Sequence, residues 1–139
     1  MLLDTNTAYE RLRAAGLKLT VQRRAVIEEL VGDESHPTTE ELARRLSARV
    51  PGMSLSTVYK VLHELVELGL VRQVDAAGAM RFDPNGADHV HVVCDECGDI
   101  FDAELPAKAV TAIKGAAPTG SAITRLDIVA RGVCPHCAA

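Results

Sequence analysis

The chain has 139 residues, of which 47% are hydrophobic and 24% charged, as expected for one folded domain or two small subdomains. Aromatic residues make up only 3%, too few for the stacking platforms of single-strand nucleic-acid binders. No apolar run reaches the roughly 18 residues that cross a membrane, and the start has neither a basic lead nor an apolar signal stretch. We therefore expect a cytoplasmic protein.

The formal net charge of −4 comes from the second part of the chain. Residues 1–82 carry 11 basic and 11 acidic side chains, whereas residues 83–139 carry 4 and 8. An acid-free window of 14 residues in the first part contains five basic ones: Arg11, Arg13, Lys18, Arg23 and Arg24. Such a patch suits a polyanion and an acidic second part suits metal cations, although these arginines could equally serve only to solvate two helices.

Four helices and a hairpin are predicted in the first part. Apolar residues at helical spacing indicate helices over residues 7–16, 21–31, 37–50 and 54–68. Thr20 is a candidate N-cap of the second helix, and Ser54 or Ser56 of the fourth. Two strands, separated by a turn at 75–78, follow at residues 70–74 and 79–82. This is the layout of a winged helix-turn-helix with one extra leading helix, whose last helix enters the major groove of DNA.

The N-terminal end of the fourth helix carries polar side chains away from its apolar face. Ser56, Thr57, Tyr59 and Lys60 offer hydroxyls, a ring and a cation, which suit phosphates and base edges. The alternative is that Tyr59 packs into the domain and the hydroxyls only cap the helix.

The second part is predicted as a small α/β unit. Strands are expected over residues 91–94, 99–104 and 122–131, and a helix over 106–115 with proline at its first position. A unit of this size has too small a core to stand alone, so we expect it to pair with a second copy through its sheet. The fold class is α+β.

Four cysteines form two C-x-x-C pairs, Cys94/Cys97 and Cys134/Cys137. Cysteines in a chain without an export signal are expected to stay reduced, and two such pairs supply the four thiolates of a structural, tetrahedral zinc site. The 36 residues between the pairs mean that zinc would attach the end of the chain to a distant strand. His136, inside the second pair, is interpreted as a spectator.

The segment between the two parts is rich in metal-ligating side chains. His89 and His91 occupy alternate positions, so on a strand both imidazoles leave the same side. Asp83, Asp88 and Asp102 supply nearby carboxylates. Histidine nitrogen with carboxylate oxygen fits iron(II), manganese(II), nickel(II) or zinc, and indicates a second metal site.

These features together resemble the ferric uptake regulator (Fur) family. The resemblance rests on the run from Leu17 to Arg23, the run from Ser54 to Leu62, the H-x-H followed by C-x-x-C-G, and the closing C-x-x-C. It implies a homodimeric transcription factor that binds an AT-rich palindromic operator, usually as a repressor. The implied domains are a winged helix (1–82), a hinge with regulatory metal ligands (83–91) and a zinc-containing dimerisation domain (92–139).

Within the family, the sequence is most similar to the peroxide-sensing (PerR) branch. That likeness implies a regulatory iron or manganese ion held by five residues: His36, Asp83, His89, His91 and Asp102. It also implies that peroxide oxidises His36 or His89. The predicted DNA-contacting residues are Lys18, Arg23, Ser56, Thr57, Tyr59 and Lys60. Lys60 stands where arginine is common, which keeps the charge but loses the guanidinium fork.

Three other functions remain open from the sequence. One is a manganese- or iron-uptake regulator without oxidative sensing. A metal-dependent hydrolase would use His89, His91 and an acid, but the chain has no evident general base or substrate pocket. A thiol redox protein would use one C-x-x-C pair. We therefore expect a regulator that is not an enzyme, with no small-molecule substrate and no membrane partner.

Overall fold

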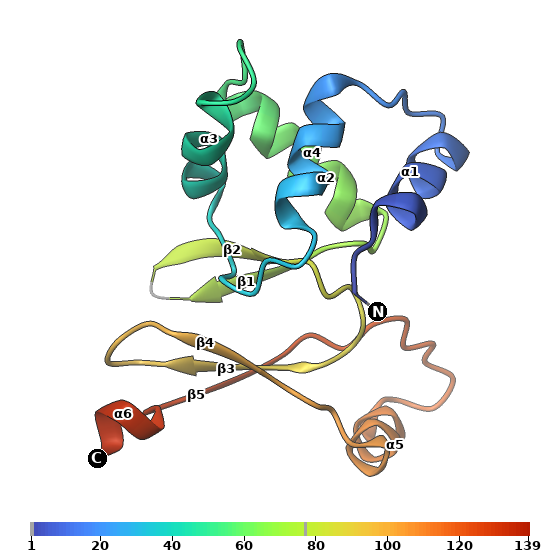
Figure 1. The fold of residues 1–139 in the computed structure, drawn as a ribbon. Coiled ribbons are helices and arrows are strands. Elements are labelled where there is room, and N and C mark those ends of the chain that lie inside the picture. Colours follow the sequence, from blue (N-terminus) through green and yellow to red (C-terminus); the bar gives the residue numbers. More distant parts are fainter. Residues whose placement is uncertain (1, 77) are drawn as a thin grey trace. The chain divides into compact units, whose positions relative to one another are not determined.

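The computed structural model describes residues 2–76 and 78–139, and the chain divides into two compact units, Met1–Ala87 and Asp88–Ala139 (Figure 1). Among the described residues, the helices are all too short or too polar to cross a bilayer.

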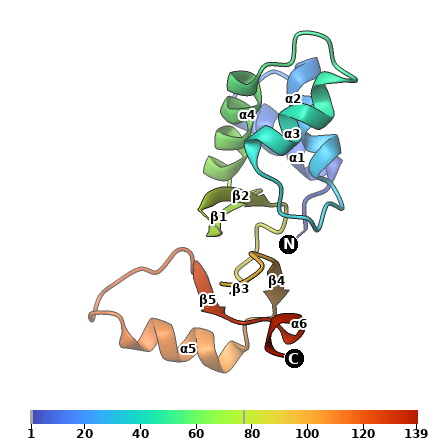
Figure 2. The ribbon, with the colours of Figure 1, turned by 90° about the vertical axis from the view of Figure 1, so that its left-hand side faces the viewer.

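The first unit is a set of helices on one side of a two-stranded hairpin (Figures 1 and 2). Its helices are α1 (Thr5–Ala14), α2 (Val21–Leu30), α3 (Thr39–Ser47) and α4 (Leu55–Glu67). The hairpin pairs β1 (Arg72–Ala76) with β2 (Ala79–Asp83) in antiparallel register. Order and type of these elements confirm the predicted winged helix. The first strand is predicted at 70–74 but lies at Arg72–Ala76, because Asp75 and Ala76 pair with Met80 and Ala79 of β2 and so belong to the strand rather than to the predicted turn at 75–78. Ala77 of that turn lies outside the described residues.

Side-chain caps fix where the helices begin. Thr20 and Ser54 accept hydrogen bonds from the third residue of α2 and α4, which confirms Thr20 and one of the two candidates for α4. The predicted start of the first helix at residue 7 is wrong, because Asp4 caps it and the helix begins at Thr5. The third helix does not begin at Pro37, because Thr38 forms a capping box with Glu41.

The core of the first unit lies where the helices meet. It is built from fully buried aliphatic side chains of α1 to α4, among them Leu12, Ile27, Leu42 and Leu62. Full burial of a leucine or isoleucine side chain contributes about 1.5–3 kcal/mol, so these contacts hold α4 firmly against the other helices.

The second unit is built on a three-stranded sheet in the order β4-β3-β5. The central strand β3 (Val90–Cys94) pairs antiparallel with β4 (Ile100–Ala103) and parallel with β5 (Ile128–Gly132). Helix α5 (Ala107–Ala116) connects β4 to the segment before β5, and the short helix α6 (Pro135–Ala138) closes the chain.

Three boundaries in the second unit differ from the sequence prediction. The strand predicted over 122–131 begins only at Ile128, because the Leu126 N–H bonds to the Asp88 carboxylate (3.2 Å) rather than to a strand. Pro106 is the N-cap of α5 and not its first residue. Helix α6, with Pro135 at its first turn, is absent from the sequence prediction, because a four-residue helix has no hydrophobic period to detect.

Gly86 is packed against the backbone that enters the hairpin. A Cβ atom at this position would overlap the Gly69 carbonyl oxygen and lie 3.2 Å from the Leu70 carbonyl group. The neighbouring segment is also held by hydrogen bonds from Leu3 N–H to the Pro84 carbonyl (2.9 Å) and from Arg72 Nε to the Gly86 carbonyl (3.1 Å). Residues 84–86 therefore have little room to move within this unit.

We predict that Gly86→Ala destabilises the first unit by about 1–3 kcal/mol, because the added methyl group must displace backbone. Thermal or urea unfolding would measure the change. Gly115→Ala in α5 is the matched control: its added Cβ meets no atom within 4 Å, so stability should be unchanged or slightly raised. Equal stability of the two variants would contradict the prediction.

Candidate metal centres and nucleic-acid interface

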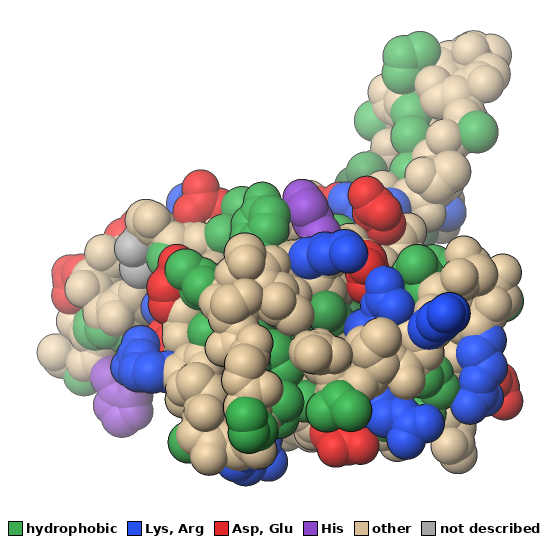
Figure 3. Space-filling view, turned by 90° about the horizontal axis from the view of Figure 1, so that it is seen from above, with side chains coloured by type: hydrophobic (Ala, Val, Ile, Leu, Met, Phe, Trp, Pro, Cys, Tyr) green, Lys and Arg blue, Asp and Glu red, His purple; other side chains and the backbone are tan. Residues whose placement is uncertain are grey.

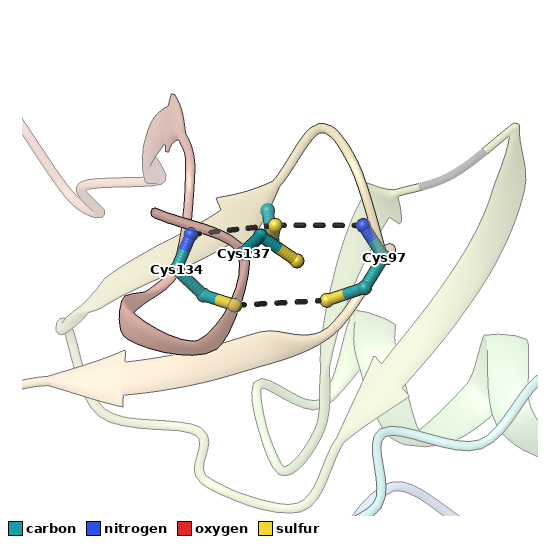
Figure 4. Close-up of side chains that lie close together, drawn as sticks. Cys97, Cys134 and Cys137 are labelled. Carbon is teal, nitrogen blue, oxygen red and sulfur yellow. Dashed lines mark hydrogen bonds between the residues drawn. The ribbon is translucent and has the colours of Figure 1, made fainter. Parts of the chain in front are cut away.

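The parallel pairing of β3 with β5 brings the two C-x-x-C segments together. Cys94 is opposite Gly132 in this register, and the Asp95 N–H donates to the Gly132 carbonyl (2.7 Å). The first pair begins at Cys94, the last residue of β3, and the second comprises the N-cap of α6, Cys134, and Cys137 within that helix, shortly after β5. Figure 4 shows the cysteine side chains converging from these two segments.

The four sulfur atoms have the spacing of a tetrahedral metal site. The Sγ atoms of Cys94, Cys97, Cys134 and Cys137 all lie within 4.8 Å of one another, and those of Cys97 and Cys134 are 3.8 Å apart. A tetrahedral zinc ion with Zn–S bonds near 2.3 Å has ligand sulfurs roughly 3.8 Å apart. The set fits zinc, and the two cysteine pairs lie together although 36 residues separate them in the sequence.

The thiols of this site differ in acidity. Backbone N–H groups of Cys97 (3.5 Å) and Cys134 (3.3 Å) point at the Cys94 sulfur and lower the pKa of Cys94 to about 6. The pKa of Cys137 is raised to about 12, mainly by the interaction of its thiol with the Cys134 sulfur and secondly by burial. At neutral pH, Cys94 is thus ready to bind a cation as a thiolate, whereas Cys137 must first lose a proton.

In the first unit, two of the predicted regulatory ligands lie together. His36 Nε2 is 3.3 Å from Asp83 Oδ2, and both side chains are buried. Asp83 is the last residue of β2, and its Oδ1 accepts the Asn85 N–H (2.8 Å). The imidazole and the carboxylate therefore form one pair of metal-ligating groups.

The backbone of His36 is in a strained conformation. Apart from glycines, it is the one described residue with a positive φ angle, 52°. Its carbonyl accepts from Arg81 Nη1 (3.2 Å), and the next carbonyl, of Pro37, accepts from the Phe82 N–H (2.9 Å). Such strain costs about 1–3 kcal/mol and is found mostly at functional sites. Strand β2 thus imposes the conformation that places the imidazole next to Asp83.

In the second unit, the other three predicted ligands lie together. His91 lies on β3 and His89 immediately precedes this strand. Their Nε2 atoms are 3.0 Å apart, so both rings leave the same side of the chain, as predicted. Asp102 lies opposite His91 in the β3–β4 register, and its Oδ1 is 3.3 Å from His89 Nε2 and 3.5 Å from His91 Nε2. Neighbouring ligand atoms of an octahedral first-row ion with bonds near 2.1 Å are roughly 3 Å apart, so this group fits a shared cation.

The sequence indicates Asp88 as a further carboxylate near the predicted regulatory metal site. In the structure, this carboxylate has a structural role. Its Oδ1 accepts the Leu126 N–H and so fixes the segment before β5 to the residue that leads into β3.

The predicted DNA-contacting residues on α4 separate into two groups. Tyr59, with 54% of its surface exposed, and Lys60 are open to solvent, and the Tyr59 ring lies 5.0 Å from that of His63. Thr57 is engaged with the N-cap, because its N–H and hydroxyl both contact the Ser54 hydroxyl.

Ser56 and Tyr59, with Met80 of the hairpin, line a groove of about 590 Å³ between α3, α4 and β2.

The basic residues near α2 also differ from one another. Lys18 is exposed in the turn between α1 and α2, and Figure 3 shows Lys and Arg side chains gathered on part of the surface. The Arg23 side chain, by contrast, is only 13% exposed, and its guanidinium is bound to Glu64 on α4. This arrangement favours a packing role for Arg23 over a DNA contact.

Sequence reasoning missed the residues that hold the ligands in place. Arg81 binds the His36 carbonyl, and its Nη1 lies 3.7 Å from Glu41 Oε1. The only sequence signal for Arg81 is a charged residue inside a short strand, which is not specific.

A winged helix followed by a small α/β unit, with a four-cysteine site and clustered histidine and aspartate ligands, defines a metal-binding protein of the winged-helix class. The chain belongs to the ferric uptake regulator family, whose model matches residues 14–129.

Individual relatives agree with this assignment. The chain is 35% identical over 135 residues to the peroxide operon regulator of Bacillus subtilis, covering 96% of this chain and 93% of that protein. PerR of Streptococcus pyogenes, whose structure concerns peroxide sensing and gene regulation, is 33% identical over 99% of this chain and 95% of its own, with a TM-score of 0.56. Fur of Helicobacter pylori is 23% identical, with a TM-score of 0.80 over 100% of this chain and 97% of its own, and shows the fold alone.

We predict that zinc binding to the metal-free protein releases protons, because thiols must become thiolates to bind the ion. Cys137, whose pKa is raised to about 12, contributes a proton at neutral pH, while Cys94, at about 6, contributes one only in more acidic solution. Apparent zinc affinity should therefore rise with pH. Calorimetry in buffers of different ionisation enthalpy measures the proton count, and Cys137→Ser should reduce it by about one. A heat that does not depend on the buffer would contradict the prediction.

Proposed function

We propose that this protein is a metal-dependent repressor of transcription that responds to peroxide through an iron(II) or manganese(II) ion. It acts as a regulator in the cytoplasm and not as an enzyme, and it has no small-molecule substrate. The observation that carries the proposal is the convergence of imidazole and carboxylate groups within each unit of a chain that contains a winged helix. The similarity to two peroxide-related regulators, at 33% and 35% identity, supports the same conclusion.

The proposed regulatory site uses His36 and Asp83 from the first unit and His89, His91 and Asp102 from the second. Three nitrogen and two oxygen ligands suit iron(II) or manganese(II) better than a soft ion such as copper(I). Each group already has donor atoms 3.0–3.5 Å apart, so little rearrangement within a unit is needed. The four cysteines hold a separate, structural zinc ion.

This ligand set explains how metal could control DNA binding. An ion bound by all five residues requires one particular arrangement of the two units, and it favours that arrangement by its difference in affinity for the two states. The rigid holding of His36 and Asp83 by β2 transmits the restraint to the winged helix. Metal loading therefore selects the arrangement that binds DNA.

Peroxide sensing depends on the identity of the bound ion. Iron(II), when bound, would supply electrons to peroxide, and the nearby imidazole of His36 or of His89 would be the group that is oxidised. An oxidised imidazole binds the ion less well, so the arrangement selected by metal is no longer favoured. Manganese(II) binds to the same ligands and resists this chemistry.

The DNA partner is a double-stranded, AT-rich palindromic operator. Helix α4 enters the major groove, where Ser56, Tyr59 and Lys60 meet the duplex and Lys18 contacts a phosphate. Thr57, in the first turn of α4, stays hydrogen-bonded to the N-cap residue Ser54, and the N-terminus of the helix favours a nearby phosphate.

A palindromic operator requires two copies of the chain. Helix α5 buries none of its residues in the structure, and Phe101, Ile113, Val129 and Val133 of the second unit are each at least 40% exposed. An apolar surface of this kind marks an interface, and a two-fold dimer through the second unit covers it.

We expect the protein to bind a Fur-type AT-rich palindrome with manganese(II) and, without oxygen, with iron(II). Addition of peroxide should abolish binding of the iron form and leave the manganese form intact. Fluorescence anisotropy of a labelled operator measures both. Binding that peroxide does not affect would indicate a metal-uptake regulator without oxidative sensing, and no binding in any metal state would refute the proposal.

The oxidation should be visible as added mass. After peroxide treatment of the iron-loaded protein, we expect one oxygen atom, about 16 Da, on the peptide that contains His36 or His89. Peptide mass spectrometry locates it, and the manganese-loaded protein is the control. Unmodified peptides in a sample that no longer binds DNA would exclude this route of sensing.

We predict that Lys18→Ala makes operator binding less dependent on salt. Removing one phosphate contact reduces the slope of log K against log [salt] by roughly 0.9. Anisotropy titrations at several salt concentrations measure the slope, and Arg125→Ala in the second unit is a control that should leave it unchanged. An unchanged slope for Lys18→Ala would remove Lys18 from the interface.

A further inference from the structure

We propose that Arg23 is a positioning residue for DNA binding, which ties helix α2 and the Lys18 turn to the DNA-binding helix α4 without contacting DNA itself. The inference rests on the proposed function, and it assigns Arg23 a role different from the phosphate contact that the sequence suggests.

The guanidinium of Arg23 donates two parallel hydrogen bonds to the carboxylate of Glu64 on α4. Nε lies 2.9 Å from Oε2 and Nη2 lies 3.0 Å from Oε1, and the two side chains are only 13% and 14% exposed. A bidentate pair of this kind is stronger and more directional than a single contact, and low exposure limits its screening by salt. It therefore fixes the distance and the rotation of α4 relative to α2.

The third nitrogen of the same guanidinium holds the turn that carries Lys18. Arg23 Nη1 donates to the Lys18 carbonyl (2.7 Å), which also accepts the Thr20 N–H (3.1 Å). The Arg23 N–H in turn donates to the Thr20 hydroxyl (3.2 Å) at the N-cap of α2. One side chain thus links the backbone of the Lys18 turn directly to α4.

The same pair keeps Lys60 available. Glu64 follows Lys60 by four residues, the spacing at which opposite charges on a helix attract each other. Both carboxylate oxygens of Glu64 are engaged by Arg23, and among the residues that the structure describes no ion pair of Lys60 is found. Without Arg23, Glu64 would be free to bind Lys60 and to repel the DNA phosphates.

The two roles of Arg23 predict opposite signs for one substitution. Glu64→Gln removes a negative charge from the DNA-binding unit, so electrostatics alone should tighten binding to a polyanion. If Arg23 acts through Glu64, the same change breaks one arm of the bidentate pair and should weaken binding instead. Glutamine keeps the size and shape of the side chain, so the fold should tolerate it.

The experiment measures operator affinity of the full-length, manganese-loaded protein by anisotropy. We expect Glu64→Gln and Arg23→Lys to weaken binding by about threefold to tenfold each, and the double variant to be no weaker than the worse single one, because coupled residues are not additive. Arg23→Lys keeps the charge and loses the fork. Glu67→Gln, an exposed glutamate on the same helix, is the control and should bind equally well or more tightly.

Three outcomes overturn the inference. Tighter or unchanged binding by Glu64→Gln, with Arg23→Ala lowering the salt slope by roughly 0.9, would make Arg23 a direct phosphate contact. Full binding by Arg23→Lys would show that only its charge matters. Failure of the unsubstituted chain to bind the operator would remove the proposed function and this inference together. Thermal melts of each variant distinguish a loss of folded protein from a change in the position of α4 relative to α2.

Discussion

The pairing of strand β3 with its two neighbours is the interaction on which the second unit and both ligand sets depend. Its antiparallel partner β4 places Asp102 opposite His91, and its parallel partner β5 brings the second cysteine pair to the first. Strand β3 therefore ends at Cys94, the first cysteine of the proposed zinc site. At its other end, His89 immediately precedes the strand and His91 lies on it. Because side chains alternate along a strand, a shift of one residue in register would separate both sets at once.

In the first unit, the winged helix prepares ligands and DNA contacts by different means. Strand β2 fixes the His36 segment through a hydrogen bond from the Arg81 side chain to the His36 carbonyl and one from the Phe82 N–H to the Pro37 carbonyl. The positive φ angle of His36 costs stability and places the imidazole in advance for metal binding. Helix α4 is fixed by apolar burial on one face and by Arg23 on its polar side. Both devices make the position of functional groups depend on packing elsewhere in the unit.

Much of this could be predicted from the sequence because the signals are local. The N-cap at Thr20, the order of four helices and a hairpin, the two rings of the H-x-H on one side of the chain and the paired cysteines all follow from spacing along the chain. Two of the errors are also local, because Asp4 and Thr38 move two helix starts. The third is not local: the hydrogen bond from Leu126 to Asp88, 38 residues away, shortens β5. In each case one side-chain hydrogen bond outweighs a hydrophobic pattern.

The sequence by itself determined the type of fold, the kinds of ligand and the two metal-binding groups, because those depend on residue identity and short-range periodicity. Only the tertiary structure decided that Arg23 binds Glu64, that Arg81 holds His36 and that Asp88 supports β5. These contacts join residues 38 to 45 positions apart. The sequence around a charged side chain does not indicate which distant residue it will contact, so its role is decided only when packing brings the two residues together.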